Sequence, residues 1–191
     1  MGVGFFAGFT RRRLLGGAGA LTLLPATATT SAAAAAPAPA AASQGETQPL
    51  RTEFVLEIRA EIAPAVIIGP SAYGTRRLIP ITGGTFEGPR LRGAVVPGGA
   101  DWQLERPDGV TSVEAKYTLK AGDGTLVSVT NRGLIVPPLA GAPAVSYIRT
   151  VPEFEAPIGA HDWLNKAVFV GSLDASQFRQ GRVLIRVFRV I

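Results

Sequence analysis

Residues 79–89 read Ile-Pro-Ile-Thr-Gly-Gly-Thr-Phe-Glu-Gly-Pro, and residues 97–103 read Pro-Gly-Gly-Ala-Asp-Trp-Gln. Both segments join short β-prone runs to a pair of glycines. Paired glycines let the backbone adopt positive φ angles or approach another group closely, so we expect a turn or bulge at each pair. The side chains of Asp101, Trp102 and Gln103 form an unusual start for a plain strand. This region is therefore the first place to look for a functional site.

The chain beyond residue 51 repeats this pattern of short β-prone runs separated by turn residues. In residues 52–62, Phe54, Leu56 and Ile58 share one face while the charged residues lie on the other, as in a half-buried antiparallel strand. No stretch holds a helical apolar period for three turns, and only residues 160–165 predict a short helical turn. The pattern indicates an all-β fold, which we predict to be a single antiparallel, mostly up-and-down β-barrel of about 8–10 strands. The other β-prone runs are 77–82, 91–96, 102–106, 110–121, 125–136, 146–154, 166–173 and 182–191.

Two Asp-Gly turns, in residues 106–110 and 121–125, set the register of neighbouring strands. Each fits a three-residue loop, in which a type I turn is closed by a glycine in the left-handed conformation. A one-residue slip would move every side chain to the opposite face, so the clean separation of apolar and charged residues supports these loops. The second turn predicts the pairs Glu114 with Arg132 on one face, and Ala115 with Asn131 and Tyr117 with Val129 on the other.

The first turn extends this register to the preceding strand. It places Asp101 and Gln103 on the same face as Ala115, Tyr117 and Asn131, so polar side chains interrupt an otherwise apolar wall. Buried polar groups need hydrogen-bond partners, which can be one another, water or a ligand. A bulge at the second glycine pair would instead turn the aspartate to the other face.

Seven blocks of sequence carry a family resemblance. They are residues 79–89, 97–103, 106–109 (Arg-Pro-Asp-Gly), 114–119 (Glu-Ala-Lys-Tyr-Thr-Leu), 131–133 (Asn-Arg-Gly), 149–155 (Arg-Thr-Val-Pro-Glu-Phe-Glu), and 163–165 (Trp-Leu-Asn) with 169–171 (Phe-Val-Gly). Together they resemble the family catalogued as domain of unknown function 3237, also called uncharacterised protein family 0311. The resemblance covers residues 52–191 and implies a single soluble antiparallel β-barrel, with no established reaction. The family pattern would place Asp-Ala-Arg-Tyr at residues 114–117 and more often an aromatic at His161, which argues against a family-wide base at that histidine.

The composition excludes several kinds of site. The chain has no cysteine and a single histidine, His161, which rules out disulfides, thiolate nucleophiles and a multi-histidine zinc site. We expect no metal and no cofactor. His161 beside Asp162 is a second candidate base, since a carboxylate can fix a histidine tautomer. The net charge is +5, but the basic residues alternate with acidic ones and form no aromatic-interleaved cluster, so we expect no nucleic-acid partner.

Residues 1–42 predict an export signal and a low-complexity region. Arg11, Arg12 and Arg13 precede a moderately apolar run that ends at Pro25, and small residues follow. This order is typical of an export signal, and an arginine pair followed by one residue and two leucines resembles the twin-arginine type. A Sec signal with an additional arginine is the alternative. The apolar run is shorter than the ~20 residues of a membrane-spanning helix, so we expect no stable membrane span after processing.

The resulting domain prediction has three parts. Residues 1–42 form the signal peptide and the Ala/Pro-rich region, residues 43–51 form a linker, and residues 52–191 form the barrel. An Ala/Pro tract has no core of its own. We therefore expect an exported protein, periplasmic or secreted, whose folded part begins at about residue 52.

The candidate site is the polar group on the predicted inner face. Asp101 is a candidate general acid or base if burial raises its pKa, and Tyr117 is a candidate proton or hydrogen-bond donor. Gln103 and Asn131 are ligand-binding candidates that would fix a substrate carbonyl. In the alternative interpretation the same four residues form a hydrogen-bonded plug at one end of the barrel. Further ligand-binding candidates are Trp102, Glu155, Trp163 and Asn165. For the two tryptophans, packing in the core or at the barrel rim is the favoured alternative to stacking on a ligand.

A barrel of this size holds either packed side chains or one small ligand. Our first hypothesis is an exported barrel that binds a small, partly apolar molecule in its mouth. The alternative is a cofactor-free lyase, isomerase, cyclase or hydrolase that uses a carboxylate there, and the second alternative is a structural homo-oligomer without a ligand. Catalysis predicts Asp101 or Glu155 buried with a raised pKa, and simple binding predicts no strong shift. A plug predicts fully paired polar groups and no cavity.

Overall fold

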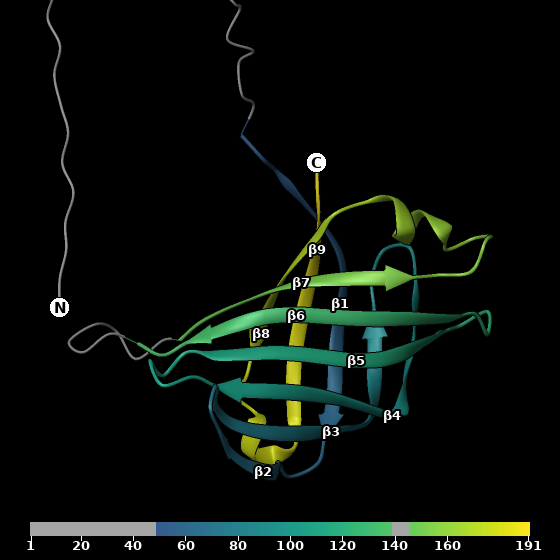
Figure 1. Cartoon of the computed structure of the whole chain (residues 1–191). Helices are drawn as coiled ribbons and strands as arrows, with labels where there is room; N and C mark the ends of the chain where they lie inside the picture. Colours follow the sequence, from purple (N-terminus) through teal and green to yellow (C-terminus); the bar gives the residue numbers. More distant parts are fainter. Residues whose placement is uncertain (1–48, 139–145) are drawn as a thin grey trace, which may run out of the picture. The chain divides into compact units, whose positions relative to one another are not determined.

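The computed structural model describes residues 49–138 and 146–191, so the predicted export signal lies outside the described residues. Nine strands form one antiparallel sheet in the order β1-β9-β8-β7-β6-β5-β4-β3-β2, and a further pairing of β1 with β3 closes it into an eight-stranded barrel with β2 as an extra strand (Figure 1). The predicted all-β antiparallel barrel is confirmed. The strands are β1 Thr52–Ile62, β2 Val66–Ser71, β3 Gly74–Glu87, β4 Arg92–Glu105, β5 Thr111–Ala121, β6 Leu126–Val136, β7 Tyr147–Glu155, β8 Phe169–Asp174 and β9 Arg182–Val190.

Strand β1 closes the barrel because it pairs along both edges. One edge pairs with β9 and the other pairs with the second half of β3. In Figure 1, β1 and β9 run across the direction of β5, β6 and β7. Gly84 lies opposite Ala60 in this closure, with a φ of 127°. A Cβ atom at Gly84 would collide with the backbone oxygen of Arg59, so the close approach of β3 to β1 requires a glycine here.

The predicted hairpin register is confirmed. Glu114 lies opposite Arg132, and Ala115 lies opposite Asn131. Both turns close with the expected backbone hydrogen bonds, from Arg106 N to Val110 O at 2.9 Å and from Ala121 N to Thr125 O at 2.8 Å. The inward faces of β5 and β6 are therefore the ones that the sequence pattern indicates.

The predicted strand boundaries were wrong in three places, of which the first is β3, Gly74–Glu87, which extends beyond the predicted run at 77–82 on both sides. The runs at 91–96 and 102–106 belong to one 14-residue strand, β4, and β2 was not predicted. Pairing of β4 with β5 shifts register between Val96 and Ala100, which is the bulge expected at the glycine pair. Pairing resumes beyond it with Asp101 opposite Ala115, so the bulge bends the strand without ending it and the aspartate keeps the inner face.

One end of the barrel is filled by side chains. Leu56, Leu119 and Val127 are fully buried there, and the rings of Phe154 and Phe169 meet edge to face with centroids 5.0 Å apart. The short 3₁₀ helix η1, Asp162–Lys166, covers this end and confirms the helical turn predicted at residues 160–165. A second short 3₁₀ helix, η2 at Phe178–Gln180, lies at the start of β9. Among residues 49–138 and 146–191, no helix is long and apolar enough to span a membrane.

The packed end predicts where stability resides. Leu119→Ala removes a fully buried side chain, and we expect it to lower the free energy of unfolding by about 2–5 kcal/mol because the cavity cannot close completely. Leu126→Ala on the next strand is the matched control, since Leu126 is 53% exposed, and should change stability by no more than about 0.5 kcal/mol. Urea denaturation followed by circular dichroism measures both, and equal losses would contradict this account of the core.

Candidate active site

The other end of the barrel encloses a cavity of about 240 Å³. Its apolar side chains come mainly from β8, β9, β1 and β3, which are neighbours in the sheet. Its polar side chains come mainly from β4, β6 and β7, on the other side of the barrel. The cavity therefore has one apolar wall and one mixed wall, called the polar wall below, in which the polar side chains lie among apolar residues of β5, β6 and β7. A largely apolar lining with a few polar groups is typical of small-molecule sites. The apolar wall includes Ala60, Ile62, Ile79, Ile81, Leu173, Val183 and Ile185, and the polar residues are Arg77, Asp101, Gln103, Asn131 and Thr150.

Cross-strand pairing places these polar residues in two adjacent rows. In the first row, Asp101 lies opposite Ala115, and Ala115 lies opposite Asn131. The small alanine leaves open space between the two polar side chains. In the second row, Gln103 of β4 lies opposite Arg77 of β3. The sequence-predicted group of Asp101, Gln103 and Asn131 therefore lines one cavity.

A chain of hydrogen bonds runs from the edge of the cavity to the aspartate. The Nε of Arg77 donates to Oε1 of Gln103 at 2.7 Å, and Nε2 of Gln103 donates to Oδ2 of Asp101 at 2.6 Å. The guanidinium Nη1 also lies 3.9 Å from Oε2 of Glu105. Arg77 is partly exposed, whereas Gln103 is only 5% exposed. The other oxygen, Oδ1 of Asp101, has no hydrogen-bond partner among the described residues.

Burial raises the pKa of Asp101. The hydrogen bond from Gln103, the backbone amide of Glu114 and the charge of Arg77 lower it, but less strongly than burial raises it. A carboxyl group in an apolar enclosure keeps its proton to higher pH because the charged form loses its hydration. Asp101 is therefore suited to act as a general acid.

Tyr117 lies in the barrel interior but in the packed core next to the cavity. Burial, and to a smaller degree the nearby charge of Asp101, raises the pKa of its phenol above the ordinary tyrosine value. The phenol therefore stays neutral and can donate a hydrogen bond, but it is a weaker acid than an ordinary tyrosine and a poor source of a transferable proton. Its hydroxyl, Oδ1 of Asn131 and Oγ1 of Thr150 have no hydrogen-bond partner within the described part of the chain. With these unpaired polar atoms and a cavity beside them, the arrangement differs from a saturated plug.

The four other ligand-binding candidates do not line this cavity. Trp102 is 44% exposed on the outer face, because it stands between two inward residues on a strand whose side chains alternate. Glu155 is likewise outward and exposed. Trp163 lies at the packed end, 6.4 Å from the ring of Phe169 and under the guanidinium of Arg90. The expectation that these side chains lie at the barrel mouth is corrected.

Asn165 has a structural contact instead of a place at the cavity. Its side-chain amide donates to the backbone oxygen of Ala156 and accepts from the backbone N–H of the same residue, both at 2.8 Å. These two bonds connect η1 to the end of β7. The sequence pattern does not distinguish an asparagine that closes such a loop from one that binds a ligand.

Sequence reasoning missed three residues that line the cavity. Arg77 continues the inward alternation of Ile79 and Ile81 on β3, so a charge on an apolar face was the available signal. Thr150 is 2% exposed on the inner face of β7. Phe178 of η2 reaches the cavity from the connection between β8 and β9, which no strand pattern predicts.

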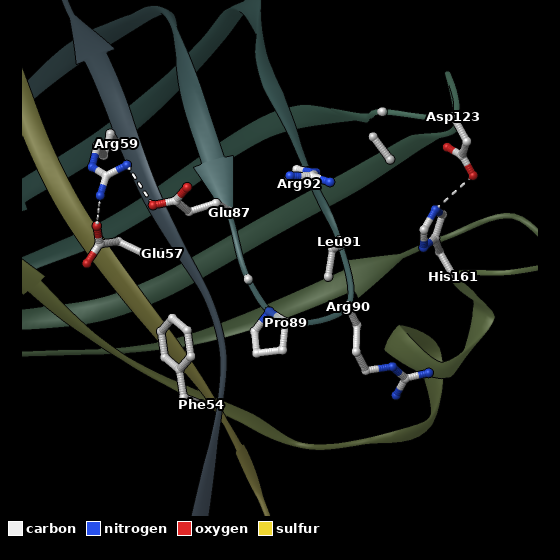
Figure 2. Close-up of a pocket in the computed structure, with 13 residues that line it drawn as sticks. Phe54, Glu57, Arg59, Glu87, Pro89, Arg90, Leu91, Arg92, Asp123 and His161 are labelled. Carbon is white, nitrogen blue, oxygen red and sulfur yellow. Dashed lines mark hydrogen bonds and ion pairs between the residues drawn. The ribbon is translucent and has the colours of Figure 1, made fainter.

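A second hollow of about 890 Å³ lies outside the packed end and is drawn in Figure 2. His161 approaches it with Nε2 3.0 Å from Oδ2 of Asp123, so the carboxylate beside its ring is that of Asp123 and not that of the adjacent Asp162. Asp162 instead accepts a hydrogen bond from Lys166 at 2.7 Å. Arg59 is paired with two glutamates on the opposite side of the same hollow (Figure 2). This open hollow is lined by the ion pairs of Arg59 and of His161 together with the guanidinium groups of Arg90 and Arg92, whereas the barrel cavity is more enclosed and largely apolar.

The chain belongs to the family described as protein of unknown function (DUF3237), whose model matches residues 50–190. The resemblance in the seven sequence blocks is thereby confirmed. A UPF0311 protein of Rhodopseudomonas palustris is 37% identical over 155 residues, which cover 76% of this chain and 99% of the relative. The crystal structure of a β-barrel-like protein from Acinetobacter baumannii is 29% identical, covers 78% of this chain and 100% of that chain, and has a TM-score of 0.71.

One more distant relative has a named activity. The hydroalkoxylation enzyme phnH of Penicillium herquei is 26% identical over 124 residues, which cover 65% of this chain and 74% of the relative. Within the described residues, no three side chains of the metal-binding types His, Asp and Glu gather into a group that could hold a metal ion.

The raised pKa of Asp101 predicts the sign of its effect on stability. A carboxyl whose pKa is higher in the folded state binds its proton more tightly there, so folding loses stability as pH rises from the ordinary aspartate pKa through the raised value. Asp101→Asn removes this loss. We therefore expect the variant to gain stability relative to the wild type as the pH is raised from acidic to neutral, measured by urea denaturation across that range.

Asp174→Asn is a control of opposite sign. The backbone N–H of Ser176 donates to this exposed carboxylate and lowers its pKa. Its contribution to stability is present above the ordinary pKa and is lost as pH falls. The asparagine variant should therefore lose stability relative to the wild type at neutral pH and match it in acid. The same pH trend for both variants would contradict the assignment at Asp101.

Proposed function

We propose that this DUF3237 protein binds a small, largely apolar molecule in its barrel cavity and transfers a proton to it from Asp101, without a cofactor. The observation that carries the proposal is a buried carboxyl group of raised pKa at the polar wall of an otherwise apolar cavity. Perturbed titratable groups in enclosed cavities are typical of catalytic sites. Among the cavity-lining residues that the structure describes, Asp101 is the single carboxylic acid.

The distant relative suggests a reaction class. Hydroalkoxylation, the activity in the name of that enzyme, adds an O–H group across a C=C bond. Neutral Asp101 can give its proton to one alkene carbon, which forms a C–H bond and leaves a cation on the other carbon. A hydroxyl oxygen of the same molecule then bonds to the cation, and its proton returns to the Asp101 carboxylate. The step conserves all atoms, needs no oxidant or reductant, and uses one carboxyl as acid and base in turn.

The two walls of the cavity fit these steps. The apolar wall would hold the hydrocarbon and keep out water that could trap the cation. The open space over Ala115 lies between Asp101 and Asn131, where a ring bearing a hydroxyl could lie. The unpaired Oδ1 of Asn131 is an acceptor for that hydroxyl, and Oγ1 of Thr150 is a second polar contact. The proposed ligand is therefore mostly hydrocarbon with oxygen on one edge.

Binding without turnover is the second candidate. It is favoured by the lining itself, in which aliphatic side chains outnumber polar ones and no second acid or base accompanies Asp101 among the described lining residues. In that case the polar wall would orient the ligand, and the carboxyl would serve as a hydrogen-bond donor. The two candidates differ in whether removing the carboxyl proton of residue 101 abolishes turnover or only changes the affinity for the ligand.

The test uses an ortho-prenylphenol as probe, in deuterated water. We expect the wild type to form the cyclic ether with one deuterium on the former alkene carbon, detected by NMR and mass spectrometry. Asp101→Asn should lower the rate by roughly 10²–10⁴-fold, the range for loss of a general acid, while leaving the affinity for the probe within a few-fold of the wild type. Asp162→Asn, which changes a carboxylate outside the cavity, is the matched control and should keep full activity.

Other outcomes decide between the candidates. Undiminished turnover in Asp101→Asn would reject the proposed acid. Binding of the prenylphenol without any product from the wild type would favour the second candidate. Filling the space with Ala115→Leu should weaken binding under either candidate, since the side chain would occupy the proposed ring position.

We also propose that the chain is exported through the twin-arginine route. The support is the sequence of the first 25 residues, in which Arg11 and Arg12 are followed by one residue and two leucines ahead of an apolar run diluted by glycine and alanine. Such a run is less apolar than a typical Sec signal. Export in a folded state would also deliver the closed barrel without unfolding it.

Substitution of the arginine pair tests the route. We expect the double change Arg11→Lys and Arg12→Lys to abolish the appearance of processed protein in the periplasm of a bacterial host, because the pair is the recognised feature. Arg13→Lys, outside the pair, is the control and should be exported normally. Cell fractionation with immunoblotting measures both. Export of the double variant that stops when the Sec pathway is inhibited would favour the Sec alternative.

A further inference from the structure

The cavity contains a hydrogen-bonded chain that proton transfer by Asp101 does not itself require. Arg77 at the cavity edge binds Gln103 at 2.7 Å, and Gln103 binds Asp101 at 2.6 Å. The middle member is 5% exposed, so its orientation is set by these protein contacts and not by solvent. Burial of an amide with both ends paired indicates a fixed geometry.

The direction of the chain follows from the chemistry of its members. A guanidinium only donates hydrogen bonds, whereas an amide side chain has one accepting oxygen and one donating nitrogen. Because Arg77 engages the oxygen of Gln103, the amide nitrogen is left to face Asp101. Oδ2 of Asp101 is therefore an acceptor, and a proton placed on it would meet the N–H of the amide. The proton of the neutral carboxyl then belongs on Oδ1, which has no partner among the residues described.

We propose that Arg77 is a positioning residue that acts through Gln103, fixing the amide so that the transferable proton of Asp101 is held on Oδ1. The inference rests on the proposed function only for the use of that proton. The arrangement itself is a property of the free protein and can be measured without a substrate.

A direct effect of charge is the competing explanation. The charged and titratable groups around Asp101 are Arg77 on β3, Tyr117 on β5 and, beyond the guanidinium, Glu105 on β4. If Arg77 acted only as a nearby positive charge, its removal would raise the pKa of Asp101 whether or not Gln103 were present. If it also acts through the amide, its removal raises the pKa more while the amide is present than after Gln103 has been replaced.

The experiment measures the pKa of Asp101 in the full chain labelled with ¹³C-aspartate. The Asp101 carboxyl resonance is assigned by its loss in Asp101→Asn and followed across pH by NMR. Gln103→Met removes the donor to the carboxylate, and Arg77→Met lets the amide rotate and offer its oxygen to the protonated acid, so we expect an upward pKa shift in each. The double variant should shift by less than the sum of the two single variants, exceeding Gln103→Met only by the lost charge of Arg77. Arg76→Met, which changes the exposed outward neighbour, is the matched control and should show no shift.

Two further results would overturn the inference. Shifts that add in the double variant would show that Arg77 acts by charge alone, and an unchanged pKa in Arg77→Met would show that it does not act on Asp101. Gln103→Met changes a buried residue and can prevent folding, so Arg77→Lys is a second test that leaves Gln103 in place. It keeps the positive charge and changes a partly exposed residue. A raised pKa there supports positioning by the guanidinium, and a wild-type pKa overturns it.

The hydrogen-bonded chain from Arg77 through Gln103 to Asp101, called the relay below, and the proposed function can be rejected independently of each other. Non-additive pKa shifts without cyclic ether from the prenylphenol would reject the reaction and leave the relay supported. Product formation together with additive or absent pKa shifts would reject the relay and leave the reaction supported. If the relay serves catalysis, Arg77→Met should also move the pH–rate profile in the direction of the measured pKa shift.

Discussion

The pairing of β1 with both β9 and β3 is the constraint on which the rest of the structure depends. It joins the two ends of the eight-stranded barrel, with β2 outside the closure, and separates an inner from an outer face along every barrel strand. Once the sheet is closed, side chains on the inner face lose most of their contact with bulk water, as Gln103 and Asn131 do. On an open sheet the Asp101 carboxylate would stay hydrated. Inside the closed barrel it loses hydration, and this burial raises its pKa. Closure of the barrel is thus the reason why an inward aspartate on β4 has a raised pKa.

Side-chain size divides the enclosed volume into two ends. Large aliphatic and aromatic residues fill one end, whereas at the other end small residues lie next to the polar side chains and leave a cavity between them and the aliphatic wall. Gly133 and Gly171 stand on the strands on either side of Thr150, and a Cβ at Gly133 would come within 2.7 Å of the threonine Cγ2. A Cβ at Gly171 would collide with Oγ1 of the same threonine. These glycines let the threonine lie close over its neighbours, which fixes the polar wall while leaving the cavity open.

The sequence predicted the features that depend on neighbouring residues, namely the turns, the strand register and which side chains share a face. The Asp-Gly turns and the period-two alternation placed Asp101, Gln103 and Asn131 on one face, because register follows from turn length and from the sorting of side chains. The effect of the bulge on Asp101, and which face lines the barrel interior, came from the structure. The closure by β1, the continuity of β4 through its bulge and the approach of Phe178 depend on contacts between distant segments, for which the sequence has no local pattern. Trp102 was misplaced for a different reason, since side-chain chemistry was given more weight than its position between two inward residues.

The interposed glutamine resolves a conflict between orientation and acidity. A guanidinium in direct contact with a buried carboxyl would favour the ionised form and lower its pKa, which would remove the acid. In this barrel the guanidinium instead binds a neutral amide, and its charge is the weakest of the influences on the pKa of Asp101, after burial and the two hydrogen bonds. The amide fixes which carboxyl oxygen accepts a hydrogen bond, because its oxygen accepts and its nitrogen donates. Since the amide is neutral, it adds no charge next to the carboxyl. An acid enclosed in an apolar cavity can thereby be held in one orientation and still keep its proton.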